Sequence, residues 1–295
     1  MKYLRLWWTG ALAGVVLMCA STAHAFEVID DRGLSVVFSE PPQRIVSLLP
    51  SLTETVCELG QCARLVGVDR YSNFPESVTK LPQVGGGLDP NIEAIVALKP
   101  DVVLMATSSR VGDRLRSLGI KAVALEPKTH ADVKRVLAKV GQVLGVEDAS
   151  RVWRLIDAAT QAAAQSLPAR VAGTRVYFEV NPGPYGAGES SFIGETLTRL
   201  GVKNIVSADL NLGPFPRLNP EFIVRADPDV IMMGQRSVDS MGQRPGWNRM
   251  RAVREQQVCV FSARQSDVLV RPGPRMAEGA RLMAQCLADK VRVAQ

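Results

Sequence analysis

Two glutamates hold the same place in a segment that the chain carries twice. Residues 91–105 and residues 219–233 each contain Asn-x-Glu, a short helical pattern, a Pro-Asp break and a run rich in β-branched residues. The matched acids are Glu93 and Glu221. A carboxylate in the first turn of a helix, just after an Asn cap, either stabilises the helix dipole or offers a negative charge to a cationic partner. Because the acid recurs, we expect a matched pair of exposed glutamates on two similar lobes.

Motifs that would support catalysis are missing. His130 is the one histidine outside the first 25 residues, and no nucleophile elbow, P-loop or dinucleotide fingerprint is present. Glu179 and Glu189 could form a carboxylate pair, but their spacing does not require it. Glycines 85–87 do not open a helix after a buried strand, so they indicate a flexible rim and not a phosphate cradle. We predict a protein that is not an enzyme, with no catalytic residue, metal site or cofactor.

The first 25 residues have the pattern of a secretory signal. Lys2 and Arg5 precede an apolar run over residues 11–20, and residues 23–25 form a small-x-small cleavage site. We therefore expect a mature chain that begins at Phe26 and is located in the periplasm. A lipoprotein would use Cys19 as its anchor, but the residue before it is not small, which makes this alternative weaker.

The charge balance argues against a nucleic-acid partner. The formal charge of +6 falls to +4 when Lys2 and Arg5 are removed with the signal. The remaining basic residues are scattered and never form a stripe interleaved with aromatic residues. The simpler interpretation is that these basic residues lie on a solvated surface. We also expect the protein to be a monomer.

Four cysteines remain outside the signal, and four cysteines allow three pairings. Disulfides are permitted in an exported protein. Cys57 and Cys62 flank a predicted helix end, where a local bond is sterically plausible. Cys259 and Cys286 could join the terminal helix to a late strand. Their spacing does not suit a zinc site.

Strands and helices alternate through the chain, which indicates an α/β fold with mainly parallel sheets. We expect an N-terminal α/β lobe over residues 26–146 and a similar C-terminal lobe over residues 169–295. Residues 147–168 contain no Gly or Pro before residue 168, and their apolar positions predict one long helix that joins the lobes. At about 1.5 Å per residue it would span roughly 30 Å.

Open α/β sheets bind ligands beside the carboxyl ends of their strands. In this chain the segments predicted to lie there are loops at residues 50–51, 71–74, 85–90, 106–110, 181–190, 212–216 and 235–244. The first four loops belong to the N-terminal lobe and the last three to the C-terminal lobe. We expect a ligand in the cleft between these two sets of loops.

Several segments resemble the periplasmic substrate-binding proteins of ABC importers with a helical backbone, a family that captures cobalamin, haem and ferric siderophores. The similarity is strongest to the cobalamin-binding members, and it rests on residues 44–54, 65–68, 71–75, 91–101, 118–120 and 219–221. The resemblance implies a two-lobe binder that delivers a large ligand to a membrane permease. It also implies that Glu93 and Glu221 dock onto arginines of the two-fold permease.

The ligand site implied by the resemblance is aromatic with a few polar anchors, as a large flat ring requires. The residues that we expect to contact the ligand are Ser51, Tyr71, Phe74, Tyr185, Phe215, Arg264 and Arg271. Phe215 stands where cobalamin-binding members carry a tryptophan, whereas Gly87 and Ala106 stand where those members have two more.

Cobalamin or another corrinoid is the ligand that the resemblance favours. A ferric siderophore is the second alternative, because Arg217, Arg236, Arg264 and Arg271 could meet its anionic oxygens. Haem ranks third, because no tyrosine follows Val84-Gly85 and an axial ligand would have to be Tyr71, Tyr185 or His130. A periplasmic sensor or adaptor without a small ligand is the alternative from another class.

Overall fold

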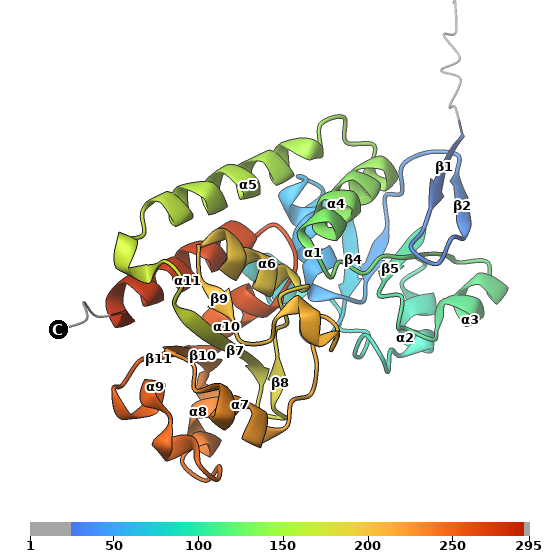
Figure 1. The fold of residues 1–295 in the computed structure, drawn as a ribbon. Coiled ribbons are helices and arrows are strands. Elements are labelled where there is room, and N and C mark those ends of the chain that lie inside the picture. The colour runs from blue at the N-terminus through green and yellow to red at the C-terminus, as the bar shows by residue number, and fades with distance from the viewer. Residues whose placement is uncertain (1–24, 292–295) are drawn as a thin grey trace, which may run out of the picture.

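The computed structural model describes residues 25–291, so almost all of the predicted signal lies outside the described residues. Within the described range, none of the helices has the length and apolar character needed to cross a membrane. Figure 1 shows helices packed around two sheets, with one long helix, α5 (Ser150–Gln165), running along one side of the molecule.

The first lobe is built on a four-stranded parallel sheet in the order β4-β3-β5-β6. Its strands are β3 (Ile45–Ser47), β4 (Leu65–Val68), β5 (Val102–Met105) and β6 (Lys121–Ala124). Its helices are α1 (Pro50–Glu58), α2 (Ile92–Ala97), α3 (Gly112–Ser117) and α4 (His130–Leu144), with 3-10 turns at Cys62–Arg64 and Glu76–Lys80. All four residues of β5 are buried, as expected for a strand covered on both faces.

The second lobe repeats this plan. Its parallel strands follow the order β9-β7-β10-β11, and a short strand, β8, pairs antiparallel with β7. The strands are β7 (Arg175–Asn181), β8 (Tyr185–Gly186), β9 (Lys203–Asn204), β10 (Val230–Gly234) and β11 (Val258–Phe261). The helices are α6 (Phe192–Arg199), α7 (Pro220–Ala226), α8 (Gln235–Met241), α9 (Arg251–Arg254), α10 (Ala263–Val270) and α11 (Met276–Lys290), with 3-10 turns at Ala169–Val171, Ala208–Leu210 and Trp247–Arg249.

The repeated segment folds the same way in both lobes. In each copy an Asn-capped helix, α2 or α7, leads into a strand, β5 or β10. That strand pairs in parallel with β3 in the first lobe and with β7 in the second. Between helix and strand, Lys99 and Asp227 occupy matched positions and both have a positive φ, of 45° and 41°. Non-glycine residues seldom adopt this conformation, so the internal repeat extends to the backbone torsions of the connecting turn.

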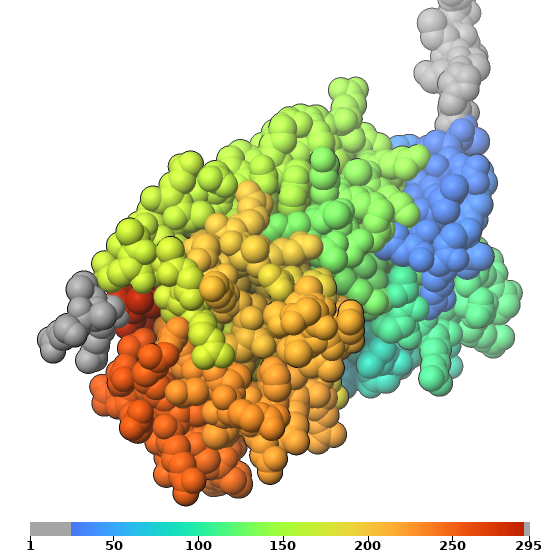
Figure 2. All heavy atoms as spheres, viewed as in Figure 1, coloured from blue at the N-terminus to red at the C-terminus, as the bar shows by residue number. Residues whose placement is uncertain are grey.

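Helix α5 (Ser150–Gln165) lies inside the segment predicted to link the lobes. It packs against α4 of the first lobe and α11 of the second (Figure 1). One apolar cluster runs through residues of both lobes, from Val28 to Leu287. Figure 2 shows the green surface of this region continuing into the yellow of the second lobe. A shared core couples the lobes more firmly than a flexible linker would.

Some elements differ from the sequence-based expectations. Residues 50–51 open helix α1, because proline is well accommodated at the first helical position. The sequence pattern predicts a loop over residues 235–244, whereas these residues fold into α8 and a turn. An unexpected antiparallel hairpin, β1 (Phe26–Ile29) with β2 (Ser35–Phe38), opens the described chain.

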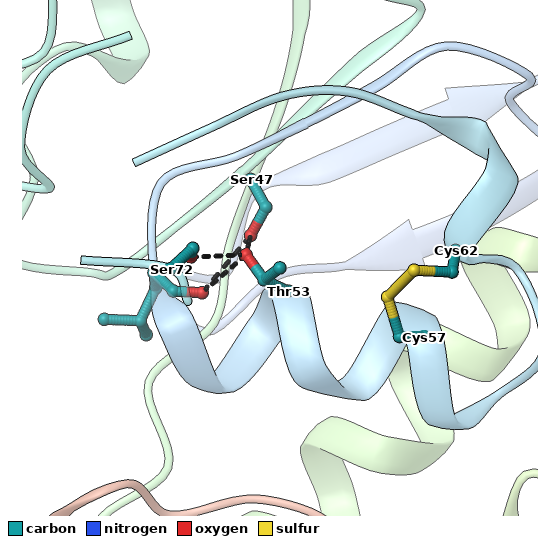
Figure 3. The surroundings of a disulfide bond; sticks show 6 residues. Ser47, Thr53, Cys57, Cys62 and Ser72 are labelled. Atoms are coloured by element: carbon teal, nitrogen blue, oxygen red, sulfur yellow. Dashed lines mark hydrogen bonds between the residues drawn. A yellow bond between two sulfur atoms is a disulfide. The ribbon is translucent and has the colours of Figure 1, made fainter. Parts of the chain in front are cut away.

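Two disulfides select one of the three possible cysteine pairings. Cys57 bonds to Cys62 at the end of α1 (Figure 3), and Cys259 on β11 bonds to Cys286 on α11. The first closes a local turn and the second ties the last helix to its sheet.

Candidate functional site

The carboxyl ends of the first-lobe strands surround a cavity of about 420 Å³. We call this hollow and its lining the first wall. It is lined by Leu48, Leu49, Pro50, Ser51, Asp69, Tyr71, Gly87, Leu88, Asp89, Ala106, Ser108, Glu126, Pro127 and Pro272. Its place relative to the sheet is the one that open α/β folds use for ligands.

The first wall combines apolar surface with carboxylates. Asp69, Asp89 and Glu126 are its charged members, and no lysine, arginine or histidine occurs among the described residues that line it. Asp89 is paired with Arg70, at 2.7 Å between Nη2 and Oδ2. The wall therefore suits a ligand that presents hydrogen-bond donors beside an apolar face.

Tyr71 projects from a loop that is held in place at several points. Its side chain is 61% exposed. The Tyr71 N–H donates to Asp69 Oδ1 at 2.8 Å, and the Ser72 hydroxyl donates to Asp69 Oδ2 at 2.5 Å. Thr53 on α1 connects this loop to the sheet, with its hydroxyl 2.8 Å from those of Ser47 and Ser72 (Figure 3). An aromatic side chain on a fixed backbone is suited to stack against a flat ligand.

Asp69, which accepts the bonds from Tyr71 and Ser72, is completely buried. Burial raises the pKa of Asp69 above its ordinary value, although hydrogen bonds from Ser72 and from the Tyr71 N–H oppose the change.

Ser51 sits in the first turn of α1 and is 3% exposed. Its hydroxyl oxygen is buried without a hydrogen-bond partner among the described residues. A buried polar atom without a partner is costly, and one that lines a cavity is a place where a ligand can supply the missing bond.

The second lobe contributes two further hollows. One of about 220 Å³ lies at the carboxyl ends of β7 and β10 and includes Asn181 and Arg236 in its lining. Another of about 540 Å³ lies between the lobes, with Phe74 and Glu76 from the first lobe and Arg264 from the second. Both are lined by Ala263 and Asp267 of α10, so the hollows adjoin. We call the second-lobe side of these hollows the second wall.

A buried ion cluster joins the lobes beside the cleft. Glu54 on α1 accepts hydrogen bonds from Arg271 at 2.9 Å and from Arg275 at 2.6 and 2.9 Å. Arg271 also bonds the Asn73 side chain and the Tyr71 carbonyl, at 2.8 and 3.0 Å, and pairs with Asp267. All three members of the Glu54 cluster have side chains no more than 10% exposed. The cluster therefore fixes the distance between the walls.

The structure brings some of the predicted contact residues together and separates others. Ser51 and Tyr71 line the first wall, while Phe74 and Arg264 line the hollow between the lobes. Arg271 is 8% exposed and its guanidinium is taken up by the Glu54 cluster.

Two of the predicted contacts, Tyr185 and Phe215, line none of the three hollows. Tyr185 is 38% exposed on β8. Phe215 packs on Phe192 with ring centroids 5.9 Å apart and is partly buried against the core.

His130 is buried between the lobes and away from the walls. Its Nε2 lies 3.0 Å from the Phe192 carbonyl oxygen and 2.9 Å from the Thr196 hydroxyl. Burial lowers the pKa of His130, although the nearby Glu195 carboxylate acts in the opposite direction. His130 is thus a contact between α4 and α6 and does not line the three hollows.

Glu179 and Glu189 do not form a carboxylate pair. Glu179 is buried in a bidentate ion pair with Arg244, at 2.6 and 2.9 Å. Glu189 accepts the Ala208 N–H at 2.9 Å. Among residues 25–291, no group of three or more His, Cys, Asp or Glu side chains is arranged to hold a metal ion.

Glu93 and Glu221 are both exposed, in the first turns of α2 and α7. Asn91 caps the first helix by accepting the Ala94 N–H at 2.9 Å, and Asn219 caps the second by accepting the Glu221 N–H at 2.9 Å. Neither glutamate is part of an ion pair between described residues, so both carboxylates are open to a partner.

Sequence reasoning did not identify Glu54, Asp69, Asp267 or Glu126 as members of the site. Asp267 and Arg271 are spaced i, i+4, a pattern that hints at an ion pair on a helix. No comparable local signal marks Glu54, because its partners lie more than 200 residues away.

Comparison with known proteins agrees with this architecture. Residues 45–264 match the family described as periplasmic binding protein. A cobalamin-binding protein of Halobacterium salinarum is 32% identical over 225 residues, which is 73% of this chain and 60% of the relative. An uncharacterized ABC transporter substrate-binding lipoprotein of Bacillus subtilis is 28% identical over 88% of this chain and 84% of the relative.

Solved structures share the fold. A periplasmic vitamin B12-binding protein of Vibrio cholerae has a TM-score of 0.70 at 23% identity, covering 86% of this chain and 99% of its own. A periplasmic haem-binding protein of Roseiflexus has a TM-score of 0.72 at 23% identity, covering 85% of this chain and 99% of its own. The vitamin B12-binding and haem-binding proteins are about equally similar to this chain in structure and sequence. The fold therefore does not distinguish between the two ligand types.

Proposed function

The chain belongs to the periplasmic binding protein family, and from this premise we propose that it binds a corrinoid, cobalamin in the first place, between its lobes. As a substrate-binding protein of the ABC importer class, it would release this ligand to a membrane permease after export to the periplasm. The family function is transport and not catalysis.

The chemistry of the first wall carries the choice of ligand. Asp89 and Glu126 offer acceptor oxygens that are not buried, and the lining holds no basic side chain within the described chain. The rim of a corrin ring bears carboxamide groups, whose N–H donors suit carboxylate and hydroxyl acceptors. Haem propionates and the anionic oxygens of ferric siderophores would instead meet negative charge here.

Axial ligation places a demand on the wall when the ligand is haem and none when it is cobalamin. Haem iron in proteins is held by His, Met, Cys or Tyr side chains. Tyr71 is the one residue of these types in the lining of the first wall, and His130 is bonded elsewhere. Cobalamin brings its own axial base, so it makes no such demand on the wall.

A ferric siderophore is the alternative that a specific observation supports. Arg236 and Arg264 line the hollows of the second wall. An anionic chelate held mainly by these two guanidinium groups would lie closer to the second lobe.

The test is a binding panel of cobalamin, cobinamide, haem and a ferric hydroxamate siderophore, read by calorimetric titration and thermal shift. A ligand that binds only the folded state stabilises it by about 2.7 kcal/mol at one hundred times its dissociation constant. We expect this with the corrinoids. A shift with haem or the siderophore alone would overturn the corrinoid assignment, and no shift with any of them would favour the adaptor alternative.

We further propose that Glu93 and Glu221 dock onto basic residues of the permease. Replacing both by arginine should reduce uptake more than tenfold, because each change places like charges in contact, at a cost of several kcal/mol. Ligand affinity should not change. Glu147→Arg, at an exposed site beside α5, is the matched control. Persistent uptake in the double variant would contradict the docking assignment.

A further inference from the structure

The N-terminal hairpin reaches the first wall from outside the sheet. Figures 1 and 2 show it in blue at the edge of the first lobe. Val28, Val36 and Phe38 bury one face of the hairpin in the core. This packing leaves the turn between the strands, with Asp30, Asp31 and Arg32, at the carboxyl ends of β5 and β6.

Arg32 holds the loop that follows β5. Its Nε and Nη2 donate to the Thr107 carbonyl oxygen at 3.1 and 2.6 Å, and Nη2 also donates to the Ser109 carbonyl oxygen. This loop contributes Ala106 and Ser108 to the first wall. A single guanidinium thus fixes two carbonyls of a loop that lines the cavity, which a side chain with a single donor cannot do as well.

The two aspartates hold the chain that follows β6. The Asp31 N–H donates to the Ala124 carbonyl at 2.8 Å, and the Asp30 carboxylate accepts the Ala124 N–H at 3.2 Å. The Asp31 carboxylate accepts the Glu126 N–H at 3.0 Å. Glu126 belongs to the first wall and also accepts a hydrogen bond from the Thr107 hydroxyl. The turn therefore connects both loops of this part of the cavity.

Asp31 is in turn fixed by α4. Lys139 Nζ lies 3.0 Å from its Oδ1, and Arg135 pairs with the same oxygen. Burial alone would raise the pKa of Asp31, but the bonds from Arg135, the Glu126 N–H and Lys139 outweigh it and lower the pKa. The acid is therefore charged at neutral pH, and the hairpin turn is held as firmly as the loops that it supports.

We infer that the hairpin turn is a positioning element of the ligand site, with Arg32 setting the shape of the first wall through the loop at residues 106–110. This inference rests on the proposed binding function and concerns the same cavity. Arg32 itself does not line the cavity. It acts through the backbone that places Ala106, Ser108 and Glu126.

The experiment compares Arg32→Ala and Arg32→Lys with a matched control, Arg64→Ala. Arg64 is also half-buried in the first lobe and donates to a backbone carbonyl, that of Leu144 at 2.9 Å, but Leu144 does not belong to a loop that lines the cavity. Two readouts are needed, the dissociation constant for cobalamin and hydrogen exchange at the amides of residues 107–110 and 126.

We expect Arg32→Ala to weaken cobalamin binding about tenfold, the equivalent of one charge-assisted hydrogen bond. Arg32→Lys should recover part of this loss, and Arg64→Ala should leave the affinity within about twofold. Exchange at the named amides should accelerate only in the Arg32 variants. Equal affinity changes in Arg32→Ala and Arg64→Ala would overturn the inference, since they would show a general loss of stability.

The two proposals can fail separately. If the unaltered protein binds no corrinoid, the proposed function fails, and hydrogen exchange still decides whether Arg32 holds the loop. If corrinoids bind but exchange and affinity are unchanged in Arg32→Ala, the positioning role is wrong and the function stands.

Discussion

The two walls of the cleft arise from the same strand topology but differ in chemistry. The first wall carries three carboxylates and no basic group among the described residues of its lining. The hollows of the second wall include Arg236 and Arg264. Both lobes keep the strand order, the capped helix and the exposed glutamate of the repeat. The strands of the core and the glutamate-bearing helix thus have matched counterparts in the two lobes. The loops that face the ligand have no such counterparts.

The walls also differ in how they are held. The Tyr71 loop is fixed by Asp69, Ser72 and Thr53, and two neighbouring loops are tied to the hairpin turn. In the second lobe, the loop that supplies Asn181 and Pro182 to the second wall is bonded by the exposed Arg217 through the Gly183 carbonyl, at 3.0 Å. Pre-organised contacts lose less entropy on binding. The first wall is therefore the one on which we expect most of the ligand affinity to depend.

Removing Glu54 should have the largest effect, because Glu54 connects the walls. Glu54→Gln leaves the buried guanidinium group of Arg275 without a charge partner and that of Arg271 with Asp267 alone. Breaking a buried pair in this way costs about 3–5 kcal/mol of unfolding free energy. Urea denaturation measures it. Asp113→Asn, which removes an exposed pair with Arg116, is the control and should leave the midpoint nearly unchanged. Similar losses in both variants would show that the cluster does not hold the walls together.

Aromatic truncations compare the first wall with an exposed tyrosine of the second lobe. Tyr71→Ala removes the exposed ring of the first wall and should raise the cobalamin dissociation constant about 10- to 100-fold, the cost of losing a large buried contact. Tyr185→Ala in the second lobe should raise it about threefold or less, because Tyr185 lines none of the hollows. Calorimetric titration gives both values. A larger effect for Tyr185 would reverse our ranking of the walls.

Removal of the second-wall charges tests the ligand class. Arg236→Ala combined with Arg264→Ala should change cobalamin affinity by about twofold or less, since rim charges contribute little to the binding of a ligand without negative groups opposite them. The same titration provides the measurement. A loss of more than tenfold in the affinity for a ferric siderophore, titrated in the same way, would instead show that the second wall meets an anionic chelate.

The smallest expected effect is on the stability of the protein at acid pH. It depends on His130, which forms an inter-lobe contact outside both walls. Burial lowers the pKa of His130 in the folded protein, and the positive charge of Arg199 lowers it further. The carboxylates of Glu195 and Asp157 act in the opposite direction but do not outweigh burial. The unfolded chain then takes up the proton first, so stability is complete above about pH 6.5 and is lost as the pH falls through the folded pKa. We expect the melting temperature to fall less between pH 7 and pH 5 in His130→Gln than in the unaltered protein. An identical fall in both would exclude a contribution from His130.

Much of the fold could be predicted from local patterns. Strands β4, β5 and β11 have the limits that their apolar runs indicate, and α5 lies within the predicted linking segment. Helix α4 was missed, although Thr129 and Asp132 form a capping box at its start. The hairpin was missed because short antiparallel strands give a weak signal and its stability comes from packing on the core.

The site was less predictable, and Arg271 shows the reason. Its residue type suits an anionic ligand, yet its guanidinium bonds Glu54, 217 residues earlier in the chain. Arg32 likewise bonds carbonyls 75 and 77 residues further along. Neither partner can be inferred from local spacing.

The sequence by itself determined what depends on neighbouring residues: the alternation of elements, the helix caps, the exposure of Glu93 and Glu221, and the duplication of the fold. These follow from hydrogen bonds and apolar periodicity within short segments. Only the tertiary structure decided which arginines face the cleft and which turn supports the cavity. Those contacts join segments far apart in the chain, and only the packing of both lobes on a common core brings them within bonding distance.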